Sequence, residues 1–140
     1  MQISFALFAD GANLSQEGKL NILGVFDAVQ VAAVPTLHPR AHLVVRLKGG
    51  RTDVGVHRVT LRWLNPERDE LWSTTGELNI GQPPSGVAEL DLPLIAMIDL
   101  PIDRAGVYAL QIALDDQPRG EVPLQVRVGA PPMPRGVLMS

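Results

Sequence analysis

The chain has 140 residues, of which 46% are hydrophobic and 19% charged, and its formal net charge at pH 7 is −3. This length suits one domain with a substantial core, and the mildly acidic balance lacks the basic excess of a nonspecific nucleic-acid binder. The absence of cysteine excludes thiolate catalysis, thiolate metal ligation and disulfides.

Two further features of the composition concern the compartment. No run of residues approaches the roughly 18 apolar residues of a membrane-spanning helix. Residues 1–9 are apolar but lack the basic start of a signal peptide. We therefore expect a cytoplasmic protein of bacterial type, without a membrane span.

The first segment predicts a strand of about seven residues. Ile3, Phe5 and Leu7 recur at every second position, the period of two that a strand produces. The strand is expected to end at Asp10 and Gly11, where a polar, glycine-containing turn begins.

Residues 20–34 remain apolar with few breaks, which is longer than a typical strand of about five or six residues. Gly24 is the residue expected to bend it, because an isolated glycine in a strand often marks a bulge or a close backbone approach. The alternative is an outer apolar face covered by a second subunit. That candidate interface contains Leu23, Val25, Val29 and Val31.

Two alternating segments, residues 42–48 and 58–63, predict strands on either side of a Gly49-Gly50 loop. If they pair as a hairpin, their outward residues form a positive stripe suited to an anion or a small molecule, made of His42, Arg46, Arg58 and Arg62. The alternative is a solvated sheet face neutralised by neighbouring acidic residues, namely Glu70, Glu77 and Glu89. No aromatic residue interleaves the stripe, so specific nucleic-acid binding is not expected.

The sequence predicts neither a metal nor a cofactor. His38 and His42 have the spacing of a helical zinc pair, but Pro39 lies between them and a strand pattern follows. Several aspartates stand at expected strand ends, yet only Asp115 and Asp116 are adjacent. We find no nucleophile beside a base, no phosphate-binding loop and no dinucleotide fingerprint, so no catalytic residue is nominated.

The segment from Asp103 to Tyr108 resembles a tyrosine corner, in which a tyrosine early in a strand bonds through its hydroxyl to the preceding connection. Residues 108–114 and 122–128 then alternate clearly and predict a hairpin. With seven to nine strands and no helix, the chain is expected to be all-β. The predicted fold is a single antiparallel β-sandwich of immunoglobulin-like or C2-like type, over residues 1–128.

Residues 129–140 contain three prolines and little periodicity, and they are expected to form a proline-rich tail. Val137 and Leu138 are apolar residues through which this tail could dock on a neighbouring molecule. They complete the candidate interface.

Three motifs together resemble a family of small bacterial proteins of unknown function. They are A-D-G-A-N-L-S-Q-E-G-K-L-N-I-L-G-V-F-D from Ala9, the His38-Pro39 pair leading into L-V-V-R-L, and the late A-G-V-Y. The resemblance covers most of the chain, from Ala9 to Val128, and implies one sandwich domain. It implies no activity, substrate or catalytic residue.

The sequence thus favours a noncatalytic binding or assembly module that binds a protein partner or itself. One alternative is an accessory protein that binds an anion or a small molecule through the arginine stripe. Another, which rests on fold analogy alone, is a phage-derived or particle structural component.

Overall fold

A computed structural model describes residues 1–129, which form nine strands and one short 3-10 turn at Arg51–Asp53. The strands are β1 Gln2–Leu14, β2 Leu20–Phe26, β3 Ala28–Val31, β4 Thr36–Gly50, β5 Gly55–Leu64, β6 Glu70–Ile80, β7 Glu89–Ile102, β8 Gly106–Leu114 and β9 Gln117–Val128. The proline-rich segment predicted over residues 129–140 lies outside the described residues, apart from Gly129. No helix in the described part of the chain is long and apolar enough to cross a membrane.

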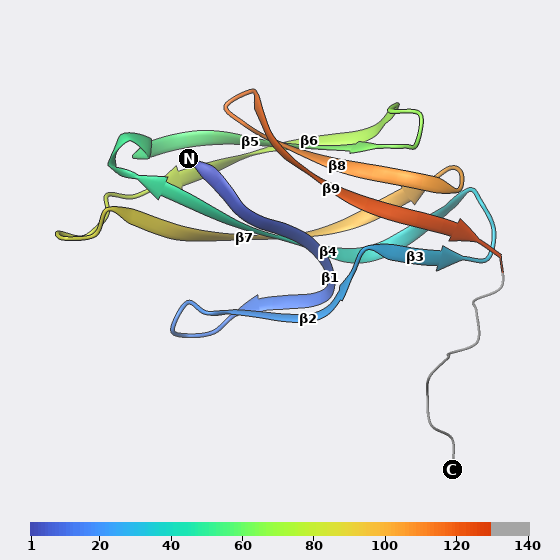
Figure 1. The fold of residues 1–140 in the computed structure, drawn as a ribbon, viewed down its shortest axis with the longest axis horizontal. Helices are drawn as coiled ribbons and strands as arrows, with labels where there is room; N and C mark the ends of the chain where they lie inside the picture. Colours follow the sequence, from blue (N-terminus) through green and yellow to red (C-terminus); the bar gives the residue numbers. More distant parts are fainter. Residues whose placement is uncertain (130–140) are drawn as a thin grey trace, which may run out of the picture.

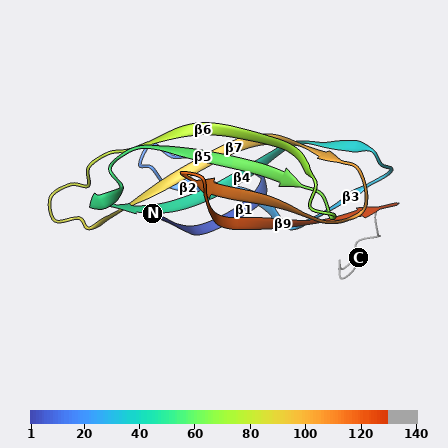
Figure 2. The same cartoon turned by 90° about the horizontal axis from the view of Figure 1, so that it is seen from above.

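The strands form two sheets that pack face to face. One has four strands in the order β2-β1-β4-β7, and the other has five in the order β3-β9-β8-β5-β6. The strands run along the length of an elongated molecule (Figure 1), which is thin when seen from above (Figure 2). The predicted all-β sandwich is therefore confirmed, with nine strands among residues 1–129.

Apolar side chains at every second position of the strands point between the two sheets and form the core. From the four-stranded sheet, Phe8, Leu43 and Val45 point inward and are fully buried. From the other sheet, Leu110 and Leu124 meet them. The predicted hairpin of residues 108–114 with 122–128 is confirmed by the antiparallel pairing of β8 with β9. Because burial of apolar area is the main stabilising term in folding, this alternation fixes which face of each strand turns inward.

A chain of aromatic rings joins the two sheets. Phe26 stacks on Phe8 with ring centroids 5.9 Å apart, and Phe8 and Trp63 are perpendicular with ring centroids 6.1 Å apart. Trp63 then stacks on Tyr108 at 5.1 Å, and its Nε1 donates a hydrogen bond to the carbonyl of Pro101 at 2.8 Å. With only 4% aromatic residues in the chain, most of the rest of the core is aliphatic.

The tyrosine corner predicted at Tyr108 is present. The Tyr108 hydroxyl accepts hydrogen bonds from the backbone N–H groups of Asp103 and Arg104, both at 3.0 Å. Its single proton faces the Asp103 carboxylate and the Arg104 carbonyl, each at 2.7 Å. Burial would raise the pKa of Asp103, but hydrogen bonds from Asn65 and Tyr108 and the charge of Arg104 together lower it.

The apolar segment of residues 20–34 is not one strand, because the chain passes between sheets at Asp27, from β2 to β3. The sandwich is mixed rather than wholly antiparallel, since β3 runs parallel to β9. Gly24 does adopt a φ of +67°, and its position interrupts the pairing of β1 with β2.

A candidate interaction surface

The β1–β2 hairpin extends beyond the rest of its sheet. β1 pairs with β4 only as far as Ala9, whereas its pairing with β2 continues to Leu14. Residues 10–24 therefore form a two-stranded extension, here called the arm, which projects from the body in Figure 1. A free hairpin of this kind exposes both of its faces unless something covers them.

The face of the four-stranded sheet that points away from the core is largely apolar. Directly opposed residues in a sheet share a face, so the pairing defines three rows across this outer face. The rows are Val25-Ala9-His42-Met97, Leu7-Val44-Ile95 and Phe5-Arg46-Pro93. Leu23, opposite Gly11, continues the same face onto the arm. We call this surface, rows and Leu23 together, the outer apolar face.

The side chains at the edges of the outer apolar face are strongly exposed. Leu23 is 73% exposed, Val25 61% and Met97 63%, whereas Ala9 and Val44 at its centre are fully buried by their neighbours. Within residues 1–129, the arm approaches one end of this face, because Leu20 and Ile22 line a pocket together with Phe5 and Pro93. Contiguous exposed apolar surface of this kind marks interaction sites in soluble proteins.

His42 lies near the middle of the outer apolar face, between Ala9 and Met97. Its Nδ1 atom is buried and has no hydrogen-bond partner among the described residues. Buried polar atoms are usually hydrogen-bonded, so this one adds a local free-energy cost to the isolated domain. The sequence-based interpretation of His42 as part of a solvated charged stripe did not foresee an apolar neighbourhood.

The arm and the outer apolar face enclose a pocket of about 420 Å³. Leu20 and Ile22 line it from the arm, and Phe5 and Pro93 line it from the sheet. Arg46 and Asp91 stand at its polar side, joined by an ion pair of 2.9 Å. The charges of Arg46 and Asp91 thus cancel. The pocket is suited to bind an apolar side chain beside the sheet.

The predicted interface is only partly brought together. Leu23 and Val25 lie on the outer apolar face, as the alternative of a covered apolar face requires. Val29 and Val31 lie on β3 in the other sheet and pack half-buried against the core, so they do not belong to the same surface. Val137 and Leu138 lie outside the described residues.

The predicted arginine stripe does not exist as one surface. β4 pairs with β1 and β7, while β5 pairs with β6 and β8, so the expected hairpin of β4 with β5 is wrong. His42 and Arg46 consequently lie in one sheet, and Arg58 and Arg62 lie in the other. The error arose because the loop after Gly50 crosses between the sheets, which alternation along a strand does not reveal.

The three arginines of that stripe are also paired with carboxylates. Arg46 binds Asp91, Arg58 binds Asp116 at 3.2 Å, and Arg62 binds Glu70 at 2.7 Å. The sequence-based alternative was neutralisation of the arginines by neighbouring acidic residues. Of the residues named for it, Glu70 does pair with Arg62. A guanidinium already paired with a carboxylate offers an incoming anion less than a free one does.

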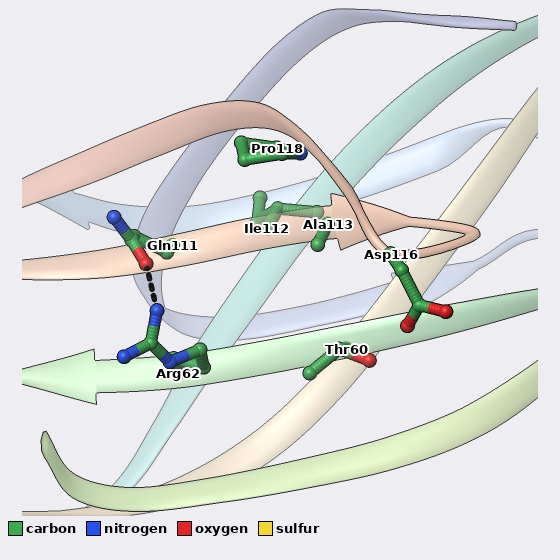
Figure 3. A pocket seen from close by; sticks show the side chains of 7 residues that line it. All are labelled: Thr60, Arg62, Gln111, Ile112, Ala113, Asp116 and Pro118. Carbon is green, nitrogen blue, oxygen red and sulfur yellow. Dashed lines mark hydrogen bonds between the residues drawn. The ribbon is translucent and has the colours of Figure 1, made fainter.

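The five-stranded sheet presents a polar outer face instead. Arg62 donates to Gln111 at 2.9 Å across the shallow pocket in Figure 3, and Gln111 donates to Glu121 at 2.9 Å. Both terminal nitrogens of Arg68 donate hydrogen bonds to the same Glu121 carboxylate, which lowers the pKa of Glu121. The two sheets therefore differ, since one outer face is a hydrogen-bonded polar network and the other is apolar.

One cluster escaped the sequence analysis. Nδ1 of His57 faces the Asp115 carboxylate and its Nε2 faces the Asp53 carbonyl, both at 2.5 Å, so the doubly protonated ring can donate to both. The hydrogen bond to Asp115 and then that to Asp53 raise the pKa of His57. The same contact lowers the pKa of Asp115, whose other oxygen accepts from the Arg58 backbone N–H at 2.9 Å. Residues 57 and 115 are far apart in sequence, and only the pairing of β5 with β8 brings them together.

The family model for DUF6941, a family of unknown function, matches residues 4–127. The chain belongs to DUF6941. This confirms the expected membership of a family of unknown function, and a search of curated proteins finds no match. The DUF6941 match runs from β1 to β9 and includes the arm and the outer apolar face, while residues 128–140 lie beyond it.

The chemistry available to this DUF6941 protein can be judged from its clusters. No group of three or more His, Asp or Glu side chains in residues 1–129 is arranged to hold a metal ion. Both ring nitrogens of His57 are engaged by acceptors, and the arginines discussed above are paired with carboxylates. The outer apolar face is the most distinctive surface feature.

Proposed function

We propose that this DUF6941 protein is a noncatalytic assembly module that self-associates through the outer apolar face of its four-stranded sheet. The observation that carries the proposal is the contrast between the two outer faces. The five-stranded sheet bears a continuous polar network from Arg62 to Glu121, whereas the four-stranded sheet bears three largely apolar rows. A domain that gains nothing from an apolar exterior would be expected to show polar residues on both faces.

A second copy of the chain is the partner that best suits this face. The outer apolar face carries the Arg46–Asp91 ion pair, whose charges cancel, so two copies approach without a large repulsion. A two-fold interface places the same patch on both sides, which suits a patch made of flexible Met and branched aliphatic side chains. Burial would also remove Leu23, Val25 and Met97 from water.

The anion-binding alternative has less support. Its premise was one positive stripe, but the four residues are divided between two sheets, and Arg46, Arg58 and Arg62 are each paired with a carboxylate. The cytoplasmic location remains part of the proposal, as does the absence of a catalytic function.

The proposal is tested by the solution mass of variants of the full chain. Leu23→Lys combined with Val25→Lys places two charges on the outer apolar face, and we expect the protein to become monomeric. Val56→Lys combined with Val107→Lys is the matched control, because these valines are 64% and 56% exposed on the other sheet. Light scattering with circular dichroism checks mass and fold together. A folded double variant that keeps the oligomeric mass of the parent would overturn the proposed surface.

A further inference from the structure

We propose that the free edge of β6 binds an extended segment of another protein, which adds to the five-stranded sheet as a further antiparallel strand. Apolar side chains at every second position of this segment enter a groove between β6 and β7, and a basic side chain faces Glu77. The site lies at the edge of the sheet that does not carry the outer apolar face, so the inference goes beyond the proposed self-association and does not rest on it.

The open edges of the two sheets differ in how well they are protected. Within residues 1–129, the edge strands are β2 and β7 in one sheet and β3 and β6 in the other. A free edge invites pairing with another chain unless it is short, irregular or interrupted by proline. β3 has four residues, β2 contains Gly24 with its φ of +67°, and β7 contains Pro93 and Pro101. β6, along one margin of the molecule in Figure 2, has eleven residues without proline, lysine or arginine, so it is the edge best suited to receive a strand.

The backbone of β6 offers hydrogen-bonding groups to such a strand. Arg58 of β5 donates its N–H to the Asp115 carboxylate at 2.9 Å and accepts the Asp115 N–H at 2.8 Å, so its peptide groups point to β8. Alternate residues of a strand share this direction, and the residues opposite them in β6 therefore direct N–H and C=O to the open edge. These exposed residues are Ser73, Thr75 and Glu77. Each can exchange about two hydrogen bonds with an added antiparallel strand.

A groove of about 500 Å³ lies beside this edge, between β6 and β7. Trp72 and Thr74 line it from β6, and Met97 and Ile98 line it from β7. Trp72, Thr74 and Gly76 lie opposite buried residues of β5 and so face the inner side of the sandwich. A Cβ at Gly76 would meet no atom within 4 Å. An added strand therefore has room for apolar side chains on this side. Of the outer apolar face, only Met97 also lines the groove.

Unpaired acidic residues define the charge of the partner. Glu77 is exposed and makes no ion pair within residues 1–129, because Arg58 opposite to it is paired with Asp116. Asp99, in the groove, accepts the backbone N–H of Arg40 and has no ion pair in the same part of the chain. A segment with a lysine or arginine opposite Glu77 complements this edge, whereas an acidic segment would be repelled.

A second copy of β6 suits the edge less well than a different chain. Antiparallel pairing of two copies about Thr75 would place Gly76 opposite Thr74, so no large apolar side chain would be available at the centre of the groove. Each copy would also bring the same unpaired Glu77 and Asp99, and β6 has no basic residue to compensate for them. A segment of another protein can supply both the apolar and the basic side chains.

The test uses the full chain and a synthetic peptide, Lys-Val-Thr-Val-Thr-Val, blocked at both ends. In the proposed register its lysine lies opposite Glu77, its threonines opposite Thr75 and Ser73, and its last valine opposite Trp72. Only the lysine and the threonines direct their N–H groups to β6. Methylation of both threonine nitrogens should weaken binding by about tenfold or more, and methylation of the first two valine nitrogens, the matched control, by less than about threefold. NMR titration gives the dissociation constants.

Variants of the protein locate the site. Thr75→Pro removes an N–H that faces the open edge, a substitution that an edge strand tolerates, and it should weaken binding by about tenfold or more. Circular dichroism checks that its fold remains. Glu77→Lys should weaken binding by about fivefold and should restore it for a peptide with glutamate in place of lysine. Glu17→Lys, in the turn between β1 and β2, makes the same charge change elsewhere and should leave the affinity unchanged.

The outcomes separate this inference from the proposed self-association. Equal effects of threonine and valine methylation, or no saturable binding up to about 5 mM peptide, would overturn the inference. A parent oligomer that loses mass on Thr75→Pro would assign the edge to a second copy and would also overturn it. The combined variant Leu23→Lys with Val25→Lys should bind the peptide as the parent does. A monomeric parent that binds the peptide would therefore remove the proposed self-association and support the β6 site.

Discussion

Val25 and Met97 lie at opposite ends of one row of side chains that crosses all four strands of the smaller sheet, and both are more than 60% exposed, at 61% and 63%. Between them lie Ala9, which is fully buried, and His42, whose Nδ1 has no hydrogen-bond partner in the described chain. The exposed apolar side chains at both ends of this row support the proposed interface between copies.

Met97→Lys should weaken self-association although Met97 is three strands away from Val25. The reason is that both residues belong to one face, so a charge at either end must be desolvated when the second copy binds. Val107→Lys, at a similarly exposed valine of the other sheet, should leave the mass unchanged. Sedimentation velocity on the two variants measures the difference, and equal behaviour of both would place the interface elsewhere.

Tyr108→Phe should destabilise the fold by about 1–3 kcal/mol, because two backbone N–H groups lose their acceptor in a half-buried corner. The ring would keep its stacking on Trp63, so the loss isolates the hydroxyl. For a domain of this size the melting temperature should fall by about 3 °C per kcal/mol. Differential scanning calorimetry provides the measurement, and an unchanged melting temperature would show that water replaces the hydroxyl without cost.

The same variant should change the titration of Asp103. A hydrogen bond from Tyr108 helps to lower the pKa of Asp103 in the parent, so this pKa should rise in Tyr108→Phe. Carboxyl carbon chemical shifts followed against pH report it directly. A pKa that does not move would assign the effect to Asn65 and Arg104 alone.

Gly24→Ala should destabilise the arm by about 1–2 kcal/mol, because φ at Gly24 is +67° and a side chain is strained there. The added Cβ would also lie 2.9 Å from Cγ of Asp10, so that side chain would have to move. Gly76→Ala is the control, since no atom lies within 4 Å of a Cβ at that position. Urea unfolding of both variants tests this, and equal midpoints would contradict it.

His57 should make stability decline as the pH rises above about 6.5. Its pKa is raised in the folded state, so its contribution is complete below the unfolded value of about 6.5 and is lost as pH rises through the folded pKa. The pKa of Asp115 is lowered, so its contribution is present above about 3.9 and is lost as pH falls through the folded value. The contact is therefore strongest between these limits.

His57→Gln should remove the decline of stability on the alkaline side. The amide carries no charge at any of these pH values, so its contacts with Asp115 and Asp53 do not titrate. Urea unfolding of parent and variant from pH 6 to pH 9 gives the comparison. A parent whose free energy of unfolding stays flat over this range, relative to the variant, would refute a charged His57 in the fold.

Much of the fold could be predicted from local sequence patterns. The predictions that failed share one cause. Alternation correctly predicted the inward faces of residues 108–114 and 122–128, and the Asp103–Tyr108 spacing predicted the corner. Alternation does not say which strand lies beside which. The chain changes sheets five times within residues 1–129. Two of these changes, at Asp27 and after Gly50, occur in short polar or glycine-containing links that also suit a hairpin.

For the same reason, only part of the candidate interaction surface could be predicted from the sequence. Leu23 and Val25 could be nominated from the sequence because both faces of β2 are apolar. Phe5, Val44 and Met97 could not be joined to them, since their common face depends on the order β2-β1-β4-β7. His57 and Asp115, fifty-eight residues apart, likewise meet only through the register of β5 with β8.

The most direct test of self-association is the solution mass of the full chain by light scattering across a wide dilution series. We expect a species of twice the 15.1 kDa chain mass that dissociates on dilution, and that Leu23→Lys with Val25→Lys converts to the monomer without loss of fold. A parent that remains at 15.1 kDa at the highest concentration would contradict the account of the outer apolar face as an interface between copies.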